Sequence, residues 1–120
     1  MSGIVGYSDF ENNLSNEQEI IDIMNNALAH RGGDGSLTWL CPEVAMGGSL
    51  FAVSDAEKVQ IPFVKTLGGQ RYVIAYDGRI CNSNELRYEL ESLGHIFDTD
   101  CSAEIVLTSY IQWREECLSR

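Results

Sequence analysis

Ser2 is the first residue of this sequence that could act as a nucleophile, because it directly follows the initiator methionine. The residues after it, Gly3–Tyr7, are mostly apolar and predict a short strand. Chain termini are normally frayed, so a terminus built into a sheet would hold Ser2, and any free amine on it, at a fixed place. The pattern fits a hydroxyl nucleophile activated by its own α-amine, or simply an ordered edge strand.

Two glycine-containing segments could also carry chemistry, and each has a structural explanation. His30–Gly35 lacks the Lys-Ser/Thr pair of a phosphate-binding loop and follows a predicted helix, which favours a structural loop. Asp77-Gly78-Arg79 follows a predicted strand and fits either a functional site or a tight turn.

Metal binding is a weak hypothesis for this sequence. Asp98, Asp100 and Glu104 lack the other ligands and the central glycine of a calcium loop, so we predict a solvated acidic loop. Zinc ligands are usually about two to four residues apart, and neither the cysteines nor His30 and His95 show that spacing. We expect free thiols at Cys41, Cys81, Cys101 and Cys117.

Composition limits the possible partners and compartments. The chain has 120 residues and a net charge of −10, and its basic residues are scattered, which argues against nucleic acid or an anionic membrane as partner. No apolar run approaches the roughly 20 residues of a membrane span, and the N-terminus lacks a secretory signal pattern. We therefore expect a single cytoplasmic domain.

The first predicted elements are the strand at Gly3–Tyr7 and a helix of about 14 residues that begins after Ser15. Ser15 and Gln18 have the spacing of a capping box, and Gly32-Gly33 would end the helix. We expect the strand to be central in its sheet. The apolar stripe of the helix is Ile20, Ile21, Met24 and Leu28.

Four β-like runs follow, separated by turn residues. Gly68-Gly69-Gln70 predicts an antiparallel hairpin between the last two, and Asp77-Gly78 predicts a tight turn after them. The runs are Leu37–Cys41, Val44–Val53, Ile61–Leu67 and Tyr72–Tyr76.

Two further helices are predicted near the end of the chain, capped by Ser83 and Ser102. Gly94 would end the first of them, whose stripe is Leu86, Leu90 and Leu93. The stripe of the second helix is Ile105, Val106, Ser109, Tyr110, Trp113 and Cys117. Strand, helix, several strands and two helices in this order indicate an α+β fold.

Several different motifs follow one another in a recognisable order along the chain. Met-x-Gly-Ile-Val-Gly at the start is followed by Leu-Ala-His-Arg-Gly-x-Asp-Gly over residues 28–35, and then by Gln60-Ile61-Pro62. Tyr72–Asn82, Asn84–Asp100 and Ala103–Leu118 complete the series. Together these motifs resemble the class II (N-terminal nucleophile) glutamine amidotransferase domain, in its asparagine synthetase-like branch. The resemblance covers essentially the whole chain.

The resemblance implies a fold and an activity. The fold is that of N-terminal nucleophile (Ntn) hydrolases, with αββα layers, here truncated to a mainly antiparallel sheet with three helices. In this family an N-terminal cysteine, freed by loss of methionine, attacks the glutamine amide with its α-amine as base. The ammonia then travels to a synthetase domain that makes asparagine from adenylated aspartate. ATP and magnesium are expected only in that downstream domain, and no cofactor in this one.

The family's site positions carry different residues in this sequence. The nucleophile position holds Ser2, whose hydroxyl is less nucleophilic than a thiol. Asp77 stands at the oxyanion-hole asparagine and has no side-chain N–H to donate when ionised, while Gly78 is retained. Leu50 replaces the basic residue that would bind the substrate carboxylate. In the same segment, Gly48 occupies the position of a histidine of the family. Arg79 and Ser102 replace the two acids at the substrate amine.

These replacements predict a degenerate site, that is, a pseudoenzyme. If Met1 is retained, the free amine is not on Ser2 and the mechanism has no base. Three interpretations remain open: an amidotransferase domain of an asparagine synthetase-like protein, with or without activity; a non-catalytic scaffold or binding module, for example of a cyclase-like ATP-dependent enzyme; and a pocket rebuilt around Arg79 and Asp77 for another small acid.

The family domain is longer than this sequence. Residues 1–120 are therefore expected to be the N-terminal part of a glutamine amidotransferase type 2-like domain, either a fragment of a longer reading frame or a truncated product. An incomplete domain would leave part of a sheet face uncovered, and we expect self-association as a consequence.

Overall fold

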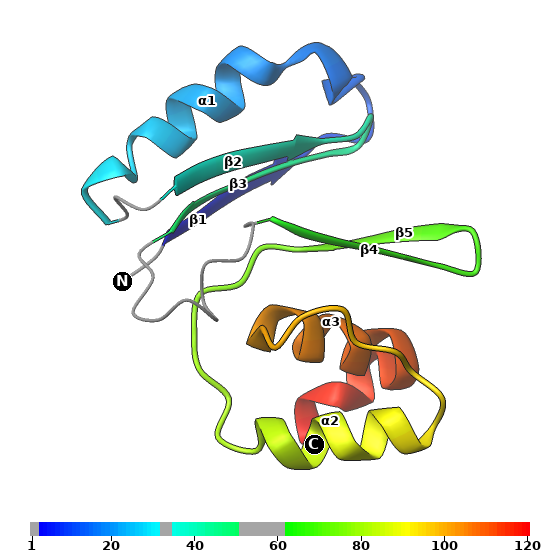
Figure 1. Ribbon diagram of the computed structural model, residues 1–120. Coiled ribbons are helices and arrows are strands. Elements are labelled where there is room, and N and C mark those ends of the chain that lie inside the picture. The colour runs from blue at the N-terminus through cyan, green and yellow to red at the C-terminus, as the bar shows by residue number, and fades with distance from the viewer. Residues whose placement is uncertain (1–2, 32–34, 51–61) are drawn as a thin grey trace. The chain divides into compact units, whose positions relative to one another are not determined.

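The computed structural model describes residues 3–31, 35–50 and 62–120 of the chain (Figure 1). The described residues form two compact units. The first contains the residues up to Pro62 together with Ala75–Asp77, and the second contains Phe63–Ile74 and Gly78–Arg120. The chain therefore passes between the units more than once.

The first unit is a three-stranded antiparallel sheet with a helix on it. Strands β1 (Gly3–Ser8), β2 (Gly35–Leu40) and β3 (Val44–Leu50) lie in the order β1-β3-β2, and helix α1 spans Gln18–Asn26. The predicted strand at the N-terminus is confirmed. Its expected central position is wrong among the described strands, because β3 pairs with both neighbours and β1 lies at the edge.

Helix α1 is shorter than predicted because its expected first turn is a separate element. Leu14–Asn16 forms a short 3-10 helix, in which the Asn13 side chain accepts a hydrogen bond from the Ser15 N–H. The residue before α1 is Glu17, which makes no side-chain cap, so the predicted capping box does not form. A second 3-10 turn, Ala29–Arg31, follows the helix.

Helix α1 packs on the sheet through a polar residue as well as an apolar one. Ile21 is fully buried and Asn25 nearly so, whereas Ile20 is 46% exposed. The Asn25 amide donates to Ser36 Oγ at 2.6 Å and to the Leu37 carbonyl at 3.2 Å. This approach favours a glycine in β3, because a Cβ on Gly47 would lie only 3.0 Å from Asn25 Cγ and 3.1 Å from Val5 Cγ2.

The second unit begins with the predicted hairpin. Strands β4 (Phe63–Leu67) and β5 (Gln70–Ile74) pair antiparallel, with Leu67 opposite Gln70. The turn consists of Gly68 and Gly69 at φ +59° and +78°, as a two-residue type I′ turn requires. The hairpin is thus confirmed; β4 ends at Leu67 as predicted, whereas β5 has the predicted length but begins two residues before the run Tyr72–Tyr76.

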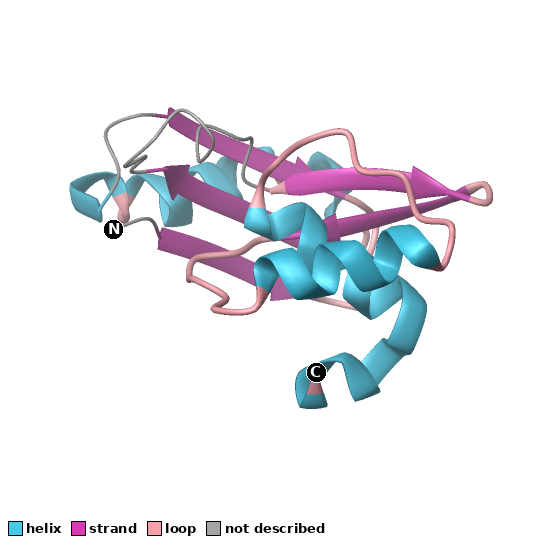
Figure 2. Cartoon of the chain, turned by 60° about the horizontal axis from the view of Figure 1, so that its bottom comes forward, coloured by secondary structure: helices cyan, strands magenta, loops and turns pink. Residues whose placement is uncertain are grey.

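Two helices complete this unit (Figure 2): α2 (Ser83–Ser92) and α3 (Ser102–Trp113). Ser83 and Ser102 are the first helical residues rather than the caps; the residues before the helices make no side-chain cap either. Gly94 has φ +98° and follows α2, as predicted.

The end of α3 differs from the sequence prediction. The helix stops at Trp113, Arg114 adopts φ +53°, and Arg114–Ser119 continues as a 3-10 helix, η4. The predicted α-helical stripe therefore does not reach Cys117. The buried residues of α3 lie in its first two turns, where Val106 is only half-buried: Ala103, Glu104, Ile105, Leu107, Thr108 and Ser109.

The described chain has an α+β fold with antiparallel sheets and three α-helices. The predicted strand Val44–Val53 extends past Leu50, and that last part lies outside the described residues. No helix in the described ranges is long and apolar enough to cross a membrane.

Candidate functional site

Of the six predicted site residues, five lie in the described part of the chain, either at the end of an element or between two elements. Ser2 lies outside the described residues, and Leu50 ends β3, opposite Gly35 of β2. Asp77, Gly78 and Arg79 are exposed in the segment between β5 and α2. Ser102 is half-buried at the first position of α3.

These positions are divided between the two units. Leu50 and Asp77 belong to the first, whereas Gly78, Arg79 and Ser102 belong to the second. The boundary falls between Asp77 and Gly78, the two residues at the predicted oxyanion position. Inside the second unit, Arg79 and Ser102 make neither a hydrogen bond nor an ion pair with each other.

Gly48, which stands at a family histidine, is buried in the middle strand of the first unit. It lies in register with Ile4 of β1 and Leu37 of β2. A glycine there has no side chain that could bind a ligand or move a proton.

Tyr7 is the titratable side chain of β1, and its hydroxyl is buried without a hydrogen-bond partner among the described residues. Burial raises the pKa of the Tyr7 hydroxyl, and the nearby carboxylates of Glu17 and Asp9 raise it further. The group therefore stays protonated at neutral pH, which makes it unsuited to act as a base.

The main charged cluster of the second unit is centred on Glu104, two residues after Ser102. This carboxylate is fully buried, and its Oε2 lies 3.1 Å from Lys65 Nζ on β4. Glu104 also accepts hydrogen bonds from the Thr99 N–H and hydroxyl, both at 2.8 Å, and from the Asp98 N–H at 3.0 Å. The predicted solvated acidic loop is thus wrong for Glu104, although Asp98 and Asp100 are exposed.

Lys65 has no donor left for a ligand. Its ammonium group donates to the Ile96 carbonyl at 3.0 Å, to Glu104 at 3.1 Å and to the Thr108 hydroxyl at 3.1 Å. A lysine ammonium group has three N–H bonds, so these contacts use all of them. The side chain is 9% exposed, which fits a structural role.

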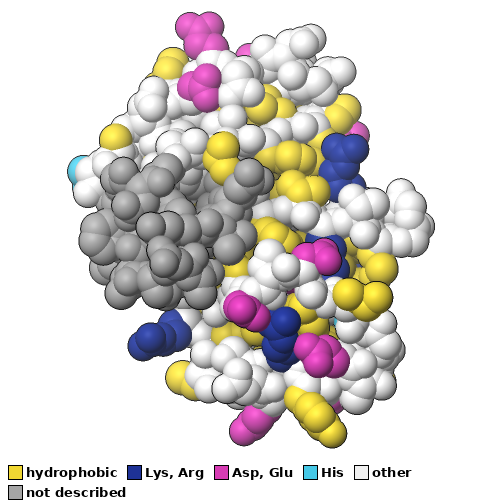
Figure 3. Space-filling view, in the orientation of Figure 1, with side chains coloured by type: hydrophobic (Ala, Val, Ile, Leu, Met, Phe, Trp, Pro, Cys, Tyr) yellow, Lys and Arg dark blue, Asp and Glu magenta, His cyan; other side chains and the backbone are white. Residues whose placement is uncertain are grey.

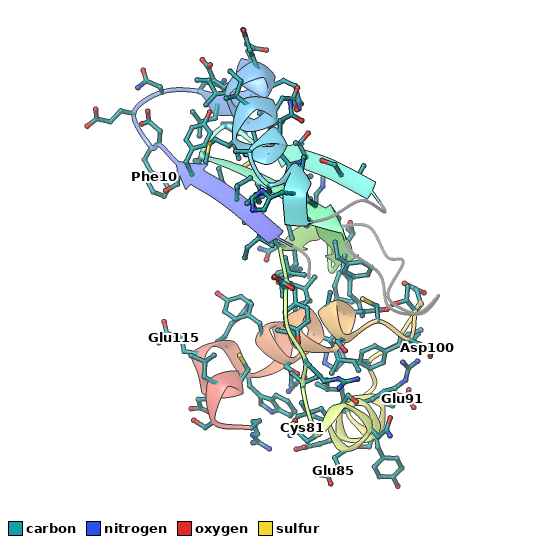
Figure 4. All side chains as sticks on the ribbon, turned by 90° about the vertical axis from the view of Figure 1, so that its left-hand side faces the viewer. Phe10, Cys81, Glu85, Glu91, Asp100 and Glu115 are labelled. Atoms are coloured by element: carbon teal, nitrogen blue, oxygen red, sulfur yellow. The ribbon has the colours of Figure 1, made fainter. Side chains whose placement is uncertain are left out.

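The loop before α3 is held from a second side by Arg87 of α2. Two cations lie near the centre of the Phe97 ring, Lys65 Nζ at 4.9 Å and Arg87 Cζ at 4.8 Å. Arg87 donates to the Thr99 carbonyl at 3.0 Å and pairs with Glu91 and Asp100, both labelled in Figure 4. Consecutive residues from Ile96 to Asp100 are therefore fixed, and with them the start of α3.

Hydrogen bonding sets the protonation state of Glu104. Burial alone raises the pKa of its carboxyl group, but the donors at Asp98, Thr99 and Lys65 together outweigh burial and hold the pKa below its ordinary value. Glu104 is therefore ionised at neutral pH. No local sequence pattern predicts this pair, because Lys65 and Glu104 are 39 residues apart along the chain.

The remaining candidates for metal or thiol chemistry are weak. All four cysteines are free, as predicted. The residues that the structure describes contain no group of three or more His, Cys, Asp or Glu side chains that could hold a metal ion. On the face of the second unit seen in Figure 3, acidic and basic side chains lie next to one another.

Comparison with known proteins identifies similar domains. A family model described as a glutamine amidotransferase domain matches residues 1–120. The chain is 38% identical over 118 residues to asparagine synthetase [glutamine-hydrolyzing] 3 of Bacillus subtilis (strain 168), which covers 98% of this chain and 19% of that protein. It is 32% identical over 106 residues to asparagine synthetase [glutamine-hydrolyzing] 1 of the same organism, covering 88% and 16%. The chain thus spans less than a fifth of the length of these relatives.

Proposed function

The chain belongs to the glutamine amidotransferase domain family, in its asparagine synthetase-like branch, and from that membership we propose that it is a member that no longer hydrolyses glutamine. The observation that carries the proposal is the joint replacement at Ser2, Leu50, Asp77, Arg79 and Ser102. A change of the nucleophile alone would have left the other four positions intact.

The replacements act on different parts of the reaction. Glutamine is a zwitterion, and the positions that would hold its ammonium group now carry Arg79 and Ser102, which repel it or offer it no charge. Leu50 cannot pair with its carboxylate. These three changes remove the charge complementarity that would orient the substrate.

The chemical step is affected independently of binding. At Asp77 an ionised carboxylate would face a developing oxyanion, where a donor is needed. Loss of one such donor typically costs about 100- to 1000-fold in rate, and repulsion adds to that cost. Ser2 in turn would need a base, because a free hydroxyl is a weak nucleophile.

The alternative function is that of a non-catalytic scaffold or binding module. The fixed Ile96–Asp100 loop and the buried Lys65–Glu104 pair favour it, because they maintain the start of α3 although Ser102 offers no charge to a substrate. The partner in either case would be a synthetase domain in the same or another polypeptide, which would hold ATP and magnesium. That domain could belong to an asparagine synthetase or to a cyclase-like amide-forming enzyme, and its nitrogen would come from a source other than this site.

Ammonia release from glutamine by the purified protein tests the proposal. We expect no release above that of a Ser2→Ala variant, which controls for contaminating glutaminase. We also expect Ser2→Cys alone to remain inactive, because the other four replacements persist. Wild-type turnover that Ser2→Ala abolishes would overturn the proposal.

Calorimetry separates the alternatives further. Glutamine should produce no binding heat with the wild-type protein. A binding signal with glutamine would favour a domain that retains its substrate site, whereas heat with another small carboxylic acid that Arg79→Ala removes would favour a rebuilt pocket. Cytoplasmic location and self-association stay predictions, and light scattering at high protein concentration tests the second.

A further inference from the structure

We draw no further inference here: the strongest candidate, the exposed apolar side chains of Ile4 and Leu37 on the face of the three-stranded sheet opposite α1, carries nothing because nothing in the structure shows what covers that face.

Discussion

At the scale of single residues, Glu104 is the side chain on which most of the second unit's polar contacts converge. A buried carboxylate is tolerated only when its charge and its lone pairs are all satisfied. Here one cation, two backbone N–H groups and one hydroxyl do so. The same donors come from β4 and from the loop before α3, so one side chain fixes two segments that are distant in sequence.

Glu104→Gln should destabilise the protein strongly. The neutral amide cannot pair with the Lys65 charge, and its NH₂ group would face donors instead of accepting from them. Breaking a buried pair in this way typically costs about 3 to 5 kcal/mol. Urea denaturation followed by circular dichroism measures the loss. The matched control is Glu91→Gln, which breaks the exposed pair with Arg87 and should cost less than about 0.5 kcal/mol. Equal losses in the two variants would contradict the structural role of Glu104.

The lowered pKa of Glu104 predicts a specific pH dependence. A carboxyl group whose pKa is lower in the folded than in the unfolded state stabilises the fold fully above the unfolded value, about 4.3, and less as the pH falls through the folded value. The free-energy gap between the wild type and Glu104→Gln should therefore be constant from neutral pH down to about 5 and narrow below about 4. Unfolding midpoints of both proteins across this range measure it, and a gap that widens on acidification would refute the assignment.

Sequence alone could not identify this pair. Glu104 follows two other acidic residues in a polar stretch, Asp98 and Asp100, and their spacing predicts a solvated loop. Its burial follows from α3 packing on β4, a contact between residues 39 positions apart. Asn25 was missed for the same reason, because a polar residue on a helix is taken as solvated unless its partner in the sheet is known.

At the scale of elements, local patterns predicted types well and ends poorly. The glycine pair of the β4–β5 turn and Gly94 after α2 were identified correctly, because positive φ angles are a property of single residues. The helix starts were wrong, since Ser15, Ser83 and Ser102 all have suitable side chains but none caps a helix here. Capping depends on the path of the chain before the helix, which the sequence does not specify.

Arg114 is the opposite case, because α3 ends there although the sequence has no glycine at that position. It adopts φ +53° between α3 and η4, and its guanidinium group lies over the rings of Tyr72 and Tyr110 at 5.7 and 5.6 Å. With ψ at −132°, Arg114 lies in a region of backbone conformation that favours glycine and costs other residues about 1 to 3 kcal/mol. The two ring contacts, each worth about 0.5 to 1 kcal/mol at such sites, offset much of that cost.

We expect Arg114→Gly to be more stable than Arg114→Ala by about 1 kcal/mol. Both variants lose the ring contacts, but only glycine adopts the positive φ angle without strain. Thermal unfolding of the two proteins gives the difference. At Tyr88, exposed in the interior of α2, the order should reverse, because glycine in a helix is about 1 kcal/mol worse than alanine. The same order at both positions would show that Arg114 is not held at positive φ.

At the scale of the whole chain, the two units are interleaved in sequence. Phe63–Ile74 belongs to the second unit, Ala75–Asp77 to the first, and Gly78 begins the second again. Composition and length predict a single domain, and no linker marks a boundary that could have indicated two units. The order of the motifs indicated the family correctly. The division of the predicted site positions between two units could not be predicted from that order.

The interleaving predicts which fragment of the second unit can fold. A fragment of residues 63–120 keeps β4, β5 and Lys65, whereas a fragment of residues 78–120 keeps both helices but leaves Glu104 buried without its cation. We expect only the longer fragment to show a cooperative thermal transition by circular dichroism, because α3 would otherwise expose both its apolar face and an unpaired charge.

A third fragment separates the hairpin from the ion pair. Residues 63–120 with Lys65→Met keep the apolar contacts of the hairpin while removing the charge, so this fragment should unfold at a lower temperature than its parent. If it matched its parent, packing alone would account for the role of β4. If residues 78–120 unfolded as cooperatively as residues 63–120, the hairpin would not belong to the core of the second unit, and the central place of Glu104 would have to be abandoned.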